Sequence, residues 1–305
     1  MATATCPACA SRLVRNRGEL PPLPRSTFGG VETAQQLDPG HLFWCPRCDL
    51  RFRHPYPDQP ALTALYENLP ATVWAFDNER DVWGRLLPLL RAYRVNDTIL
   101  DVGCFRGDFL HWLPGGWRKL GIEPNVAARA VAARRGIRLV GSTIEDAAVS
   151  EGSVGAVTIL DVLEHLHQPL EALARLRHWL APGGSIFVFT GAADTLPWRF
   201  CGRHYWYSAL PEHVTFFSLR WFRWAARQLG MRVRAHAYLA SERQSRKRWL
   251  LQGTRATLYT AVQQARSAGL PERLLCGLPL LGRAARWRHV PWWTEAADHI
   301  LVVLS

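Results

Sequence analysis

The sequence predicts an α/β protein built on a doubly wound sheet. From residue 96 onward, strand-like apolar stretches alternate with helix-like stretches. The first strand candidates are short and rich in apolar residues, as expected for parallel strands that are covered on both faces. Such an alternation gives a Rossmann-like sheet with helices on both sides, and its ligands bind at the carboxyl ends of the strands.

Seven strands are expected in this sheet. They fall at residues 98–102, 118–123, 137–141, 154–162, 185–190, 232–239 and 299–304, and helices are expected at 107–113, 125–135, 168–180 and 218–229. The sheet domain therefore spans 96–240 and 294–305. Residues 241–293 form a basic helical insertion before the last strand.

Two Cys-Pro-x-Cys pairs, "CPAC" and "CPRC", stand in the first 57 residues. Paired knuckles supply four thiolates that close a tetrahedron around Zn²⁺ and leave no open position, which makes the metal structural. The alternatives are two disulfides, which a cytosolic compartment disfavours, or a redox pair, which the duplication disfavours. We expect a zinc ribbon over 1–57 with the ligands Cys6, Cys9, Cys45 and Cys48.

A helical linker is expected between the ribbon and the sheet, over residues 58–95. Pro55, Pro57 and Pro60 oppose regular structure at its start. Apolar residues then recur at helical spacing around 62–66 and again over 79–94, where the pattern continues despite Pro88.

The loop after the first strand, within "ILDVGCFRGDFL" (99–110), does not fit a dinucleotide. A pyrophosphate requires Gly-x-Gly-x-x-Gly for close backbone approach. Here the spacing is Gly-x-x-x-Gly, and Phe105 stands between the glycines. The sequence therefore disfavours NAD.

Acidic residues follow successive strands, which suits a cationic, phosphate-free cofactor. S-adenosylmethionine is such a molecule: Asp101 can accept from its ammonium, Gly103 admits the methionyl part, and Glu123 can accept from the ribose hydroxyls. A single acidic residue at the end of one strand would be interpreted as solvent-exposed, without a ligand. Glu145 or Asp146 can reach the adenine amino group. Further cofactor contacts are expected from Cys104, Phe105, Gly107, Pro124, Ile144, Asp161 and Val162.

These stretches resemble the class I S-adenosylmethionine-dependent methyltransferases, especially the bacterial small-molecule group related to ubiquinone-biosynthesis O-methyltransferases. "ILDVGCFRGDFL" looks like the first cofactor motif, "GIEPN" the ribose acid and "STIEDA" the adenine motif. "ILDVLEHLHQPLEAL" and "LAPGGSIFVFT" resemble the fourth and fifth strands with their helix and turn, and "PEHVTFFS" a substrate-side block.

The resemblance covers about residues 6–240 and the last strand, because "CPRCDLRFRHPYPDQPALTALY" also looks like the zinc ribbon and linker of one subset. It implies a methyltransferase with S-adenosylmethionine as cofactor. Phe105 departs from the family pattern at the second glycine, and we expect its ring to lean off the cofactor.

Transfer of a methyl group to a neutral hydroxyl needs a base, and histidine is the commonest one. The candidates are His213, in the substrate-side block, His165, just past the fourth strand, and His204. Each could instead cap a helix or bond a backbone carbonyl. Asp161 is expected to shape the pocket floor, and the aromatic stretch 201–213 to wall it.

The positive charge is concentrated in the insertion. The chain carries a net charge of +12, and 241–293 holds nine Arg and one Lys against two Glu. Two apolar sets are expected on its helices: Leu251, Leu258, Val262 and Ala265, and then Leu274, Leu275, Leu278 and Leu281. The flanking charges and aromatics are Arg246, Lys247, Arg248, Arg283, Arg286, Arg288, Trp249, Trp287, Trp292 and Trp293.

Three interpretations of the insertion stay open: a helical cover over the active site, contact with an anionic membrane surface, and an RNA footprint. No signal peptide or apolar run near 20 residues is visible. We therefore expect a cytoplasmic protein able to touch a membrane surface.

The expected function is methylation, most simply at oxygen, of a small molecule, a sugar or a lipid-linked intermediate. The alternatives are an RNA methyltransferase and a non-catalytic zinc-ribbon binding module. Enzymes that methylate adenine N6 carry an Asn/Asp-Pro-Pro-aromatic turn after strand four, whereas this chain has "LDVLEH". A nucleic-acid acceptor is therefore disfavoured.

Overall fold

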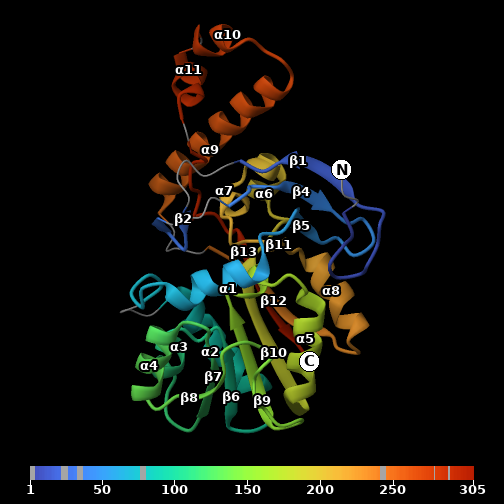
Figure 1. Cartoon of the computed structure of the whole chain (residues 1–305), viewed down its shortest axis with the longest axis vertical. Coiled ribbons are helices and arrows are strands. Elements are labelled where there is room, and N and C mark those ends of the chain that lie inside the picture. The colour runs from blue at the N-terminus through green and yellow to red at the C-terminus, as the bar shows by residue number, and fades with distance from the viewer. Residues whose placement is uncertain are drawn as a thin grey trace.

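The computed structural model describes residues 4–21, 27–32, 37–75, 80–240, 245–277, 279–287 and 289–305. The strands in this part of the chain form a seven-stranded sheet, a four-stranded sheet and a two-stranded ribbon of β2 (Thr27–Phe28) and β3 (Val31–Glu32). The seven-stranded sheet occupies the lower half of the molecule in Figure 1, with the four-stranded sheet above it.

The central sheet confirms the predicted fold class. Its order is β12-β13-β10-β9-β6-β7-β8, and β13 is antiparallel to both of its neighbours. The strands are β6 (Thr98–Val102), β7 (Arg118–Ile122), β8 (Arg138–Gly141), β9 (Val154–Leu160), β10 (Leu180–Gly191), β12 (Val233–Leu239) and β13 (His299–Leu304). All seven predicted strands are present, and β9 ends just before Asp161, whose φ is +53°.

Helices cover both faces of this sheet because side chains alternate across its strands. One apolar core contains Leu100, Val157 and Val188, and the other contains Ile99, Ala156 and Phe187. The surrounding helices are α2 (Asp81–Tyr93), α3 (Asp108–Trp112), α4 (Val126–Arg134), α5 (Pro169–Trp179) and α8 (Leu219–Gln228). The predicted helices are therefore confirmed, including α2 with Pro88 inside it.

The N-terminal strands form a second sheet that also includes a strand from much later in the chain. Its order is β1 (Arg15–Glu19), β4 (His41–Trp44), β5 (Arg51–His54) and β11 (Thr215–Phe216). Phe52 lies opposite Thr215 in the antiparallel pair of β5 and β11. The first 57 residues therefore share a sheet with residues some 160 positions later.

Short helices connect these layers. Helix α1 (Gln59–Asn68) begins after Asp58, which accepts a hydrogen bond from the backbone N–H of Ala61. It crosses the molecule between the two larger sheets (Figure 1). The aromatic segment after β10 folds into α6 (Leu196–Cys201), the 3-10 turn Gly202–His204 and α7 (Trp206–Ala209), and a second 3-10 turn, Leu163–His165, follows β9.

The basic insertion forms a helical arm, α9 (Arg246–Ser267), α10 (Glu272–Gly277) and α11 (Pro279–Ala285), whose far end projects from the body (Figure 1). Leu258, Val262 and Ala265 pack together with Leu275, as the pattern predicts. Leu251 is 51% exposed and lies outside this cluster. A second contact of α9 runs through Gly253, Ala256 and Tyr259, where Trp293 packs closely on Gly253. Leu278 and Arg288 lie outside the described residues.

Candidate active site

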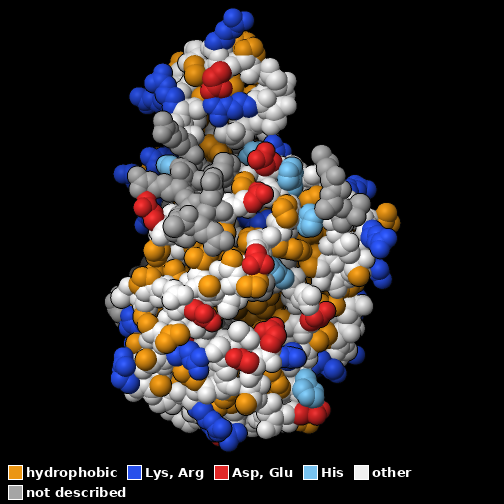
Figure 2. Space-filling model, viewed as in Figure 1, with side chains coloured by type: hydrophobic (Ala, Val, Ile, Leu, Met, Phe, Trp, Pro, Cys, Tyr) orange, Lys and Arg blue, Asp and Glu red, His pale blue; other side chains and the backbone are white. Residues whose placement is uncertain are grey.

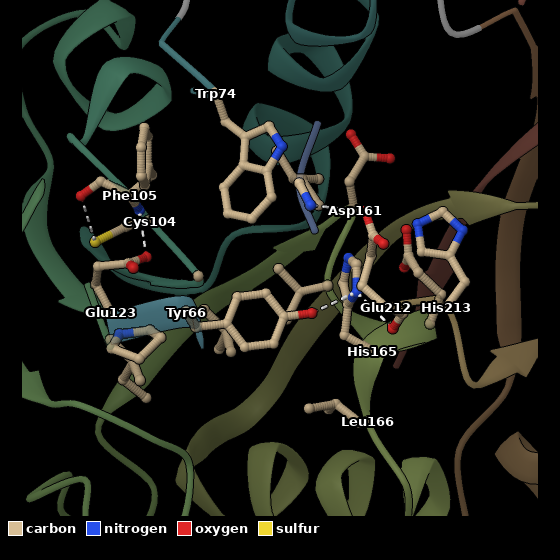
Figure 3. A pocket seen from close by; sticks show the side chains of 18 of the residues that line it. Tyr66, Trp74, Cys104, Phe105, Glu123, Asp161, His165, Leu166, Glu212 and His213 are labelled. Carbon is tan, nitrogen blue, oxygen red and sulfur yellow. Dashed lines mark hydrogen bonds between the residues drawn. The ribbon is translucent and has the colours of Figure 1, made fainter. Parts of the chain in front are cut away.

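A cavity of about 1630 Å³ opens at the carboxyl ends of β6, β7 and β9. Acidic side chains gather around the hollow in the middle of the face shown in Figure 2. Two groups of wall residues lie at opposite sides of the cavity in Figure 3, the loop after β6 on one side and His165 and His213 on the other. The cavity therefore has room for a nucleoside cofactor and an acceptor together.

Two glycines shape the loop after β6. Gly103 has φ +73°, and a Cβ there would lie 2.4 Å from Val162 Cγ2. Gly107 precedes α3 with φ +72°, and a Cβ there would collide with Ile137. Gly103, Cys104 and Val162 line the cavity, whereas Gly107 is absent from its lining. Gly107 therefore serves the packing of the turn.

Asp101 and Glu123 are both buried and both line this cavity. Asp101 Oδ1 accepts a hydrogen bond from Thr158 Oγ1 at 2.7 Å. Glu123 accepts from the backbone N–H groups of Phe105, at 2.7 Å, and Asn125, at 2.8 Å. Burial raises the pKa of each carboxyl to about 7. A cation bound beside Asp101 and Glu123 would favour their ionised carboxylates, so this pair fits the positively charged S-adenosylmethionine.

The loop after β8 contributes to the cavity wall. Ile144 and Glu145 line the cavity, as does Pro124 after β7. Asp146 instead holds the loop together, because its Oδ1 accepts from the backbone N–H groups of residues 142 and 143. Glu145 is thus the acid of the predicted pair that faces the cavity.

Phe105 adopts a left-handed backbone with φ +47°. Its ring turns away from Glu123 toward Trp74, with ring centroids 5.7 Å apart in an edge-to-face contact (Figure 3). The N–H of the same residue bonds Glu123. Phe105 therefore orients a cavity acid through its backbone while its ring packs on Trp74.

His165 and His213 lie side by side in the cavity wall, with ring centroids 4.9 Å apart. His213 Nδ1 is 2.9 Å from Tyr207 O, so Nδ1 carries the proton, since a carbonyl can only accept. His165 Nδ1 lies 3.0 Å from Glu212 O and 2.8 Å from the Tyr66 hydroxyl (Figure 3). Both Nδ1 atoms are engaged, which leaves Nε2 of each ring for other partners.

The His213 ring is held in its neutral form. Burial lowers its pKa well below the ordinary value, and the neighbouring His165, Arg53 and His299 act in the same direction. A neutral ring with Nδ1 protonated has its lone pair on Nε2. His213 can therefore accept a proton at Nε2. His204, by contrast, is absent from the cavity lining and packs near Tyr259 of the arm.

Glu164 lies beside these histidines, and one ligand atom from each of Glu164, His165 and His213 falls within 4.8 Å of the others. Both oxygens of Glu164 already accept hydrogen bonds, Oε1 from Tyr207 at 2.5 Å and Oε2 from Thr190 at 2.8 Å. Glu164 therefore belongs to a hydrogen-bonded network with Tyr207 and Thr190.

Asp161 follows β9 and faces the cavity within a charged group that the sequence did not indicate. Its carboxylate pairs with Arg80 at 2.9 Å and lies 3.9 Å from His299 Nε2. Burial lowers the pKa of His299, but the carboxylates of Asp298 and Asp161 outweigh it and raise that pKa. Asp161, which was expected to shape the pocket floor, thus belongs to a network of charged groups with Arg80 and His299.

Sequence reasoning missed His299, Arg80, Tyr66 and Glu212 among the cavity residues. His299 begins β13, and only the insertion of that strand between β10 and β12 brings it here. Tyr66 lies in α1, and Arg80 immediately precedes α2. Glu212 adjoins His213 in "PEHVTFFS", so the motif itself carried a signal for it.

No described residue of 245–287 lines the cavity, so the expected helical cover over the site is not seen. Trp206 and Trp292 instead stack at its rim, with ring centroids 5.1 Å apart. Trp292 belongs to the segment between the arm and β13.

The four N-terminal thiols come together as the spacing predicts. All four are free, and the sulfur atoms are 3.5 Å apart for Cys6 with Cys48 and for Cys9 with Cys45. This separation is too long for a disulfide, at about 2.05 Å, and suits four ligands around one ion. Ligand atoms of the set all lie within 4.8 Å of one another.

A sequence model described as "Methyltransferase domain" matches residues 75–236. The chain belongs to this methyltransferase family. The match includes strands β6 to β10, the glycine loop and both histidines, and it ends within β12, before β13. None of the helices in the described part of this methyltransferase has the length and apolar character needed to cross a bilayer.

Curated relatives of the methyltransferase are ubiquinone biosynthesis O-methyltransferases. The protein from Vibrio parahaemolyticus is 28% identical over 146 residues, 43% of this chain and 62% of its own length. The protein from Serratia proteamaculans is 26% identical over 150 residues, which cover 44% of this chain and 62% of its own length. The chain thus spans less than two thirds of these relatives. A solved methyltransferase from Archaeoglobus fulgidus aligns at TM-score 0.47 and 15% identity, over 81% of this chain and 99% of that one.

Proposed function

We propose that the methyltransferase transfers the methyl group of S-adenosylmethionine to a hydroxyl oxygen of a small molecule. The observation that carries this proposal is the His213 ring, neutral, buried in the cavity wall and tied at Nδ1 to Tyr207 O. The relatives' name, ubiquinone biosynthesis O-methyltransferase, supports oxygen as the accepting atom.

When bound, S-adenosylmethionine supplies an electrophilic methyl group on a sulfonium. Asp101 and Glu123, which line the cavity, would hold the cationic cofactor, Gly103 would give backbone access, and Ile144 and Glu145 would face the adenine. Cys104, Pro124, Asp161 and Val162 complete this part of the wall. In-line placement of the acceptor oxygen accounts for most of the acceleration.

His213 accepts the hydroxyl proton at Nε2 as the oxygen–carbon bond forms and the carbon–sulfur bond breaks, its electron pair staying on sulfur. The Nδ1–H bond to Tyr207 O holds the ring in the tautomer that this step requires. His165, whose Nδ1 is likewise engaged, is the second candidate base.

The proposal is tested by incubating the protein with a cell extract and S-adenosylmethionine labelled in the methyl group. We expect label in an organic-extractable small molecule, with the methyl on oxygen. Label confined to RNA or to protein would contradict the proposed acceptor class. Boiled protein and a His213→Gln variant serve as controls.

Cofactor binding is expected to strengthen as the pH rises through about 7. Burial raises the pKa values of Asp101 and Glu123 to about 7, so below that pH the cation must displace protons to bind. Calorimetry at about pH 6 and about pH 8 measures the change, and proton release appears as a buffer-dependent enthalpy. Equal affinity at both pH values would contradict the prediction.

We also propose one structural Zn²⁺ at Cys6, Cys9, Cys45 and Cys48. A strong chelator is expected to lower the thermal midpoint by about 5 °C or more, because metal binding and ribbon folding are coupled. Elemental analysis should give about one zinc per chain. Cys276→Ser is the matched control, since Cys276 is exposed and outside the cluster. Metal-free protein with two disulfides would refute the assignment.

The arm supports a third proposal, contact with an anionic membrane surface that carries a lipid-linked acceptor. Figure 2 shows basic and hydrophobic side chains together on the projecting part. Trp249, Leu250 and Leu274 are 41%, 60% and 57% exposed. Arginine beside exposed tryptophan and leucine suits the headgroup region of a bilayer.

Vesicles with phosphatidylglycerol are expected to bind the protein, and phosphatidylcholine vesicles to bind it about tenfold less. Arg246→Glu with Lys247→Glu should reverse this preference in co-sedimentation. Arg134→Glu with Arg138→Glu, at exposed positions of α4 and β8, makes the same charge change away from the arm. Equal loss in both double variants would point to net charge alone and reject the arm as the contact.

A further inference from the structure

Arg53, within β5, is the most buried charged side chain of the four-stranded sheet and is 1% exposed. A guanidinium is rarely buried without a carboxylate partner. Among the described residues, the side-chain hydrogen bonds of Arg53 go to main-chain carbonyl oxygens instead. Nε donates to His213 O at 3.1 Å, and Nη2 donates to Ser208 O and Leu210 O, each at 2.9 Å. Nη1 donates to Pro39 O.

Three of these carbonyls belong to one stretch, residues 208–213, which ends at the proposed base. Tyr207 O, which fixes His213 Nδ1, immediately precedes it. The chain that follows is held by the same strand, because the Arg53 N–H donates to Val214 O at 2.9 Å and β5 pairs with β11. Arg53 of β5 therefore hydrogen-bonds to the chain on both sides of His213.

We infer that Arg53 is a positioning residue for methyl transfer: its side chain fixes the 208–213 loop so that His213 presents Nε2 to the cavity. This rests on the proposed role of His213. It makes the zinc ribbon a part of the acceptor site, since the ring's orientation depends on a side chain from the ribbon. A forked guanidinium can bind several carbonyls at once, which an ammonium cannot match in geometry.

Arg53→Met and Arg53→Lys test the inference, with Arg51→Met as the matched control. Arg51 stands on the same strand and face, but its guanidinium lies 3.8 Å from Asp49 and not on the loop. Three readouts are needed: the His213 tautomer by nitrogen-15 NMR of histidine side chains, cofactor affinity by calorimetry, and the rate of labelled methyl transfer.

In Arg53→Met we expect His213 to lose its single Nδ1–H tautomer and the methyl-transfer rate to fall about 100-fold, since a displacement of about 1 Å has that effect. Cofactor affinity should stay within about twofold, because Asp101 and Glu123 lie on other strands. Arg53→Lys should keep the charge yet recover only part of the rate. Arg51→Met should match the wild type in all three.

A wild-type tautomer and rate in Arg53→Met would overturn the inference. If Arg53→Met loses zinc or cofactor binding, Arg53→Lys decides the question. An unchanged His213 tautomer and rate in Arg53→Lys would overturn the inference, whereas a changed tautomer would support it. A changed tautomer together with full activity in His213→Gln would reject His213 as the base while leaving the positioning by Arg53 in place.

Discussion

Replacing His213 with glutamine is expected to lower the methyl-transfer rate by about 10²- to 10⁴-fold, the usual contribution of a general base. Glutamine is similar in size and polar, but it cannot take up a proton near neutral pH. The cofactor Kd should change by less than about twofold, because the ring lies on the other side of the cavity from Glu123 (Figure 3).

The same rate measurement on His165→Gln separates the two candidate bases, and His236→Gln, on an exposed position of β12, is the control. If His165→Gln loses activity and His213→Gln keeps it, the base is His165. A full rate in both variants would remove the general-base step and with it the preference for a hydroxyl acceptor.

Replacing Glu123 with glutamine is expected to weaken S-adenosylmethionine binding by about 10- to 100-fold. A hydrogen bond to a charged acceptor contributes about 1.5–3 kcal/mol, which corresponds to that range of Kd. Both carboxylate oxygens of Glu123 accept hydrogen bonds from backbone N–H groups, one at Phe105 and one at Asn125. In the glutamine variant the side-chain NH₂ would face one of these N–H groups and could not accept its hydrogen bond. The glycine loop should therefore lose part of its support as well.

Calorimetry with S-adenosylmethionine and with S-adenosylhomocysteine measures this effect, and Glu67→Gln, at an exposed position of α1, is the control. Both ligands carry the ribose, so both should lose affinity in Glu123→Gln. A loss restricted to S-adenosylmethionine would mean that Glu123 acts on the sulfonium charge and that its place at the ribose is wrong.

Local pattern predicted the sheet and much of the cavity wall. Strand periodicity is a short-range property, and parallel strands bring Asp101, Gly103 and Glu123 to one edge wherever the fold forms. The adjacent acids at 145–146 marked the right loop but not which of them faces the cavity, because one turned inward to bond the loop's own N–H groups.

Long-range pairing was not predictable in the same way. Strand β11 has two residues, too few for any periodicity, and its partner β5 lies some 160 positions earlier. Arg53 stands in "RFRH", a pattern that indicates solvent-facing arginines, yet its side chain is buried on carbonyls supplied by a distant loop. His299 likewise reached the cavity only through the order of strands in the sheet.

The pairing of β5 with β11 bears on how this protein can be divided. A chain begun after residue 57 would leave β11 with an open edge and remove the buried Phe52 and Arg53 from beneath it. Expressed alone, the catalytic part should therefore aggregate. Joining it to a ribbon borrowed from another protein should restore solubility only if that ribbon brings a matching strand and an arginine at the equivalent place.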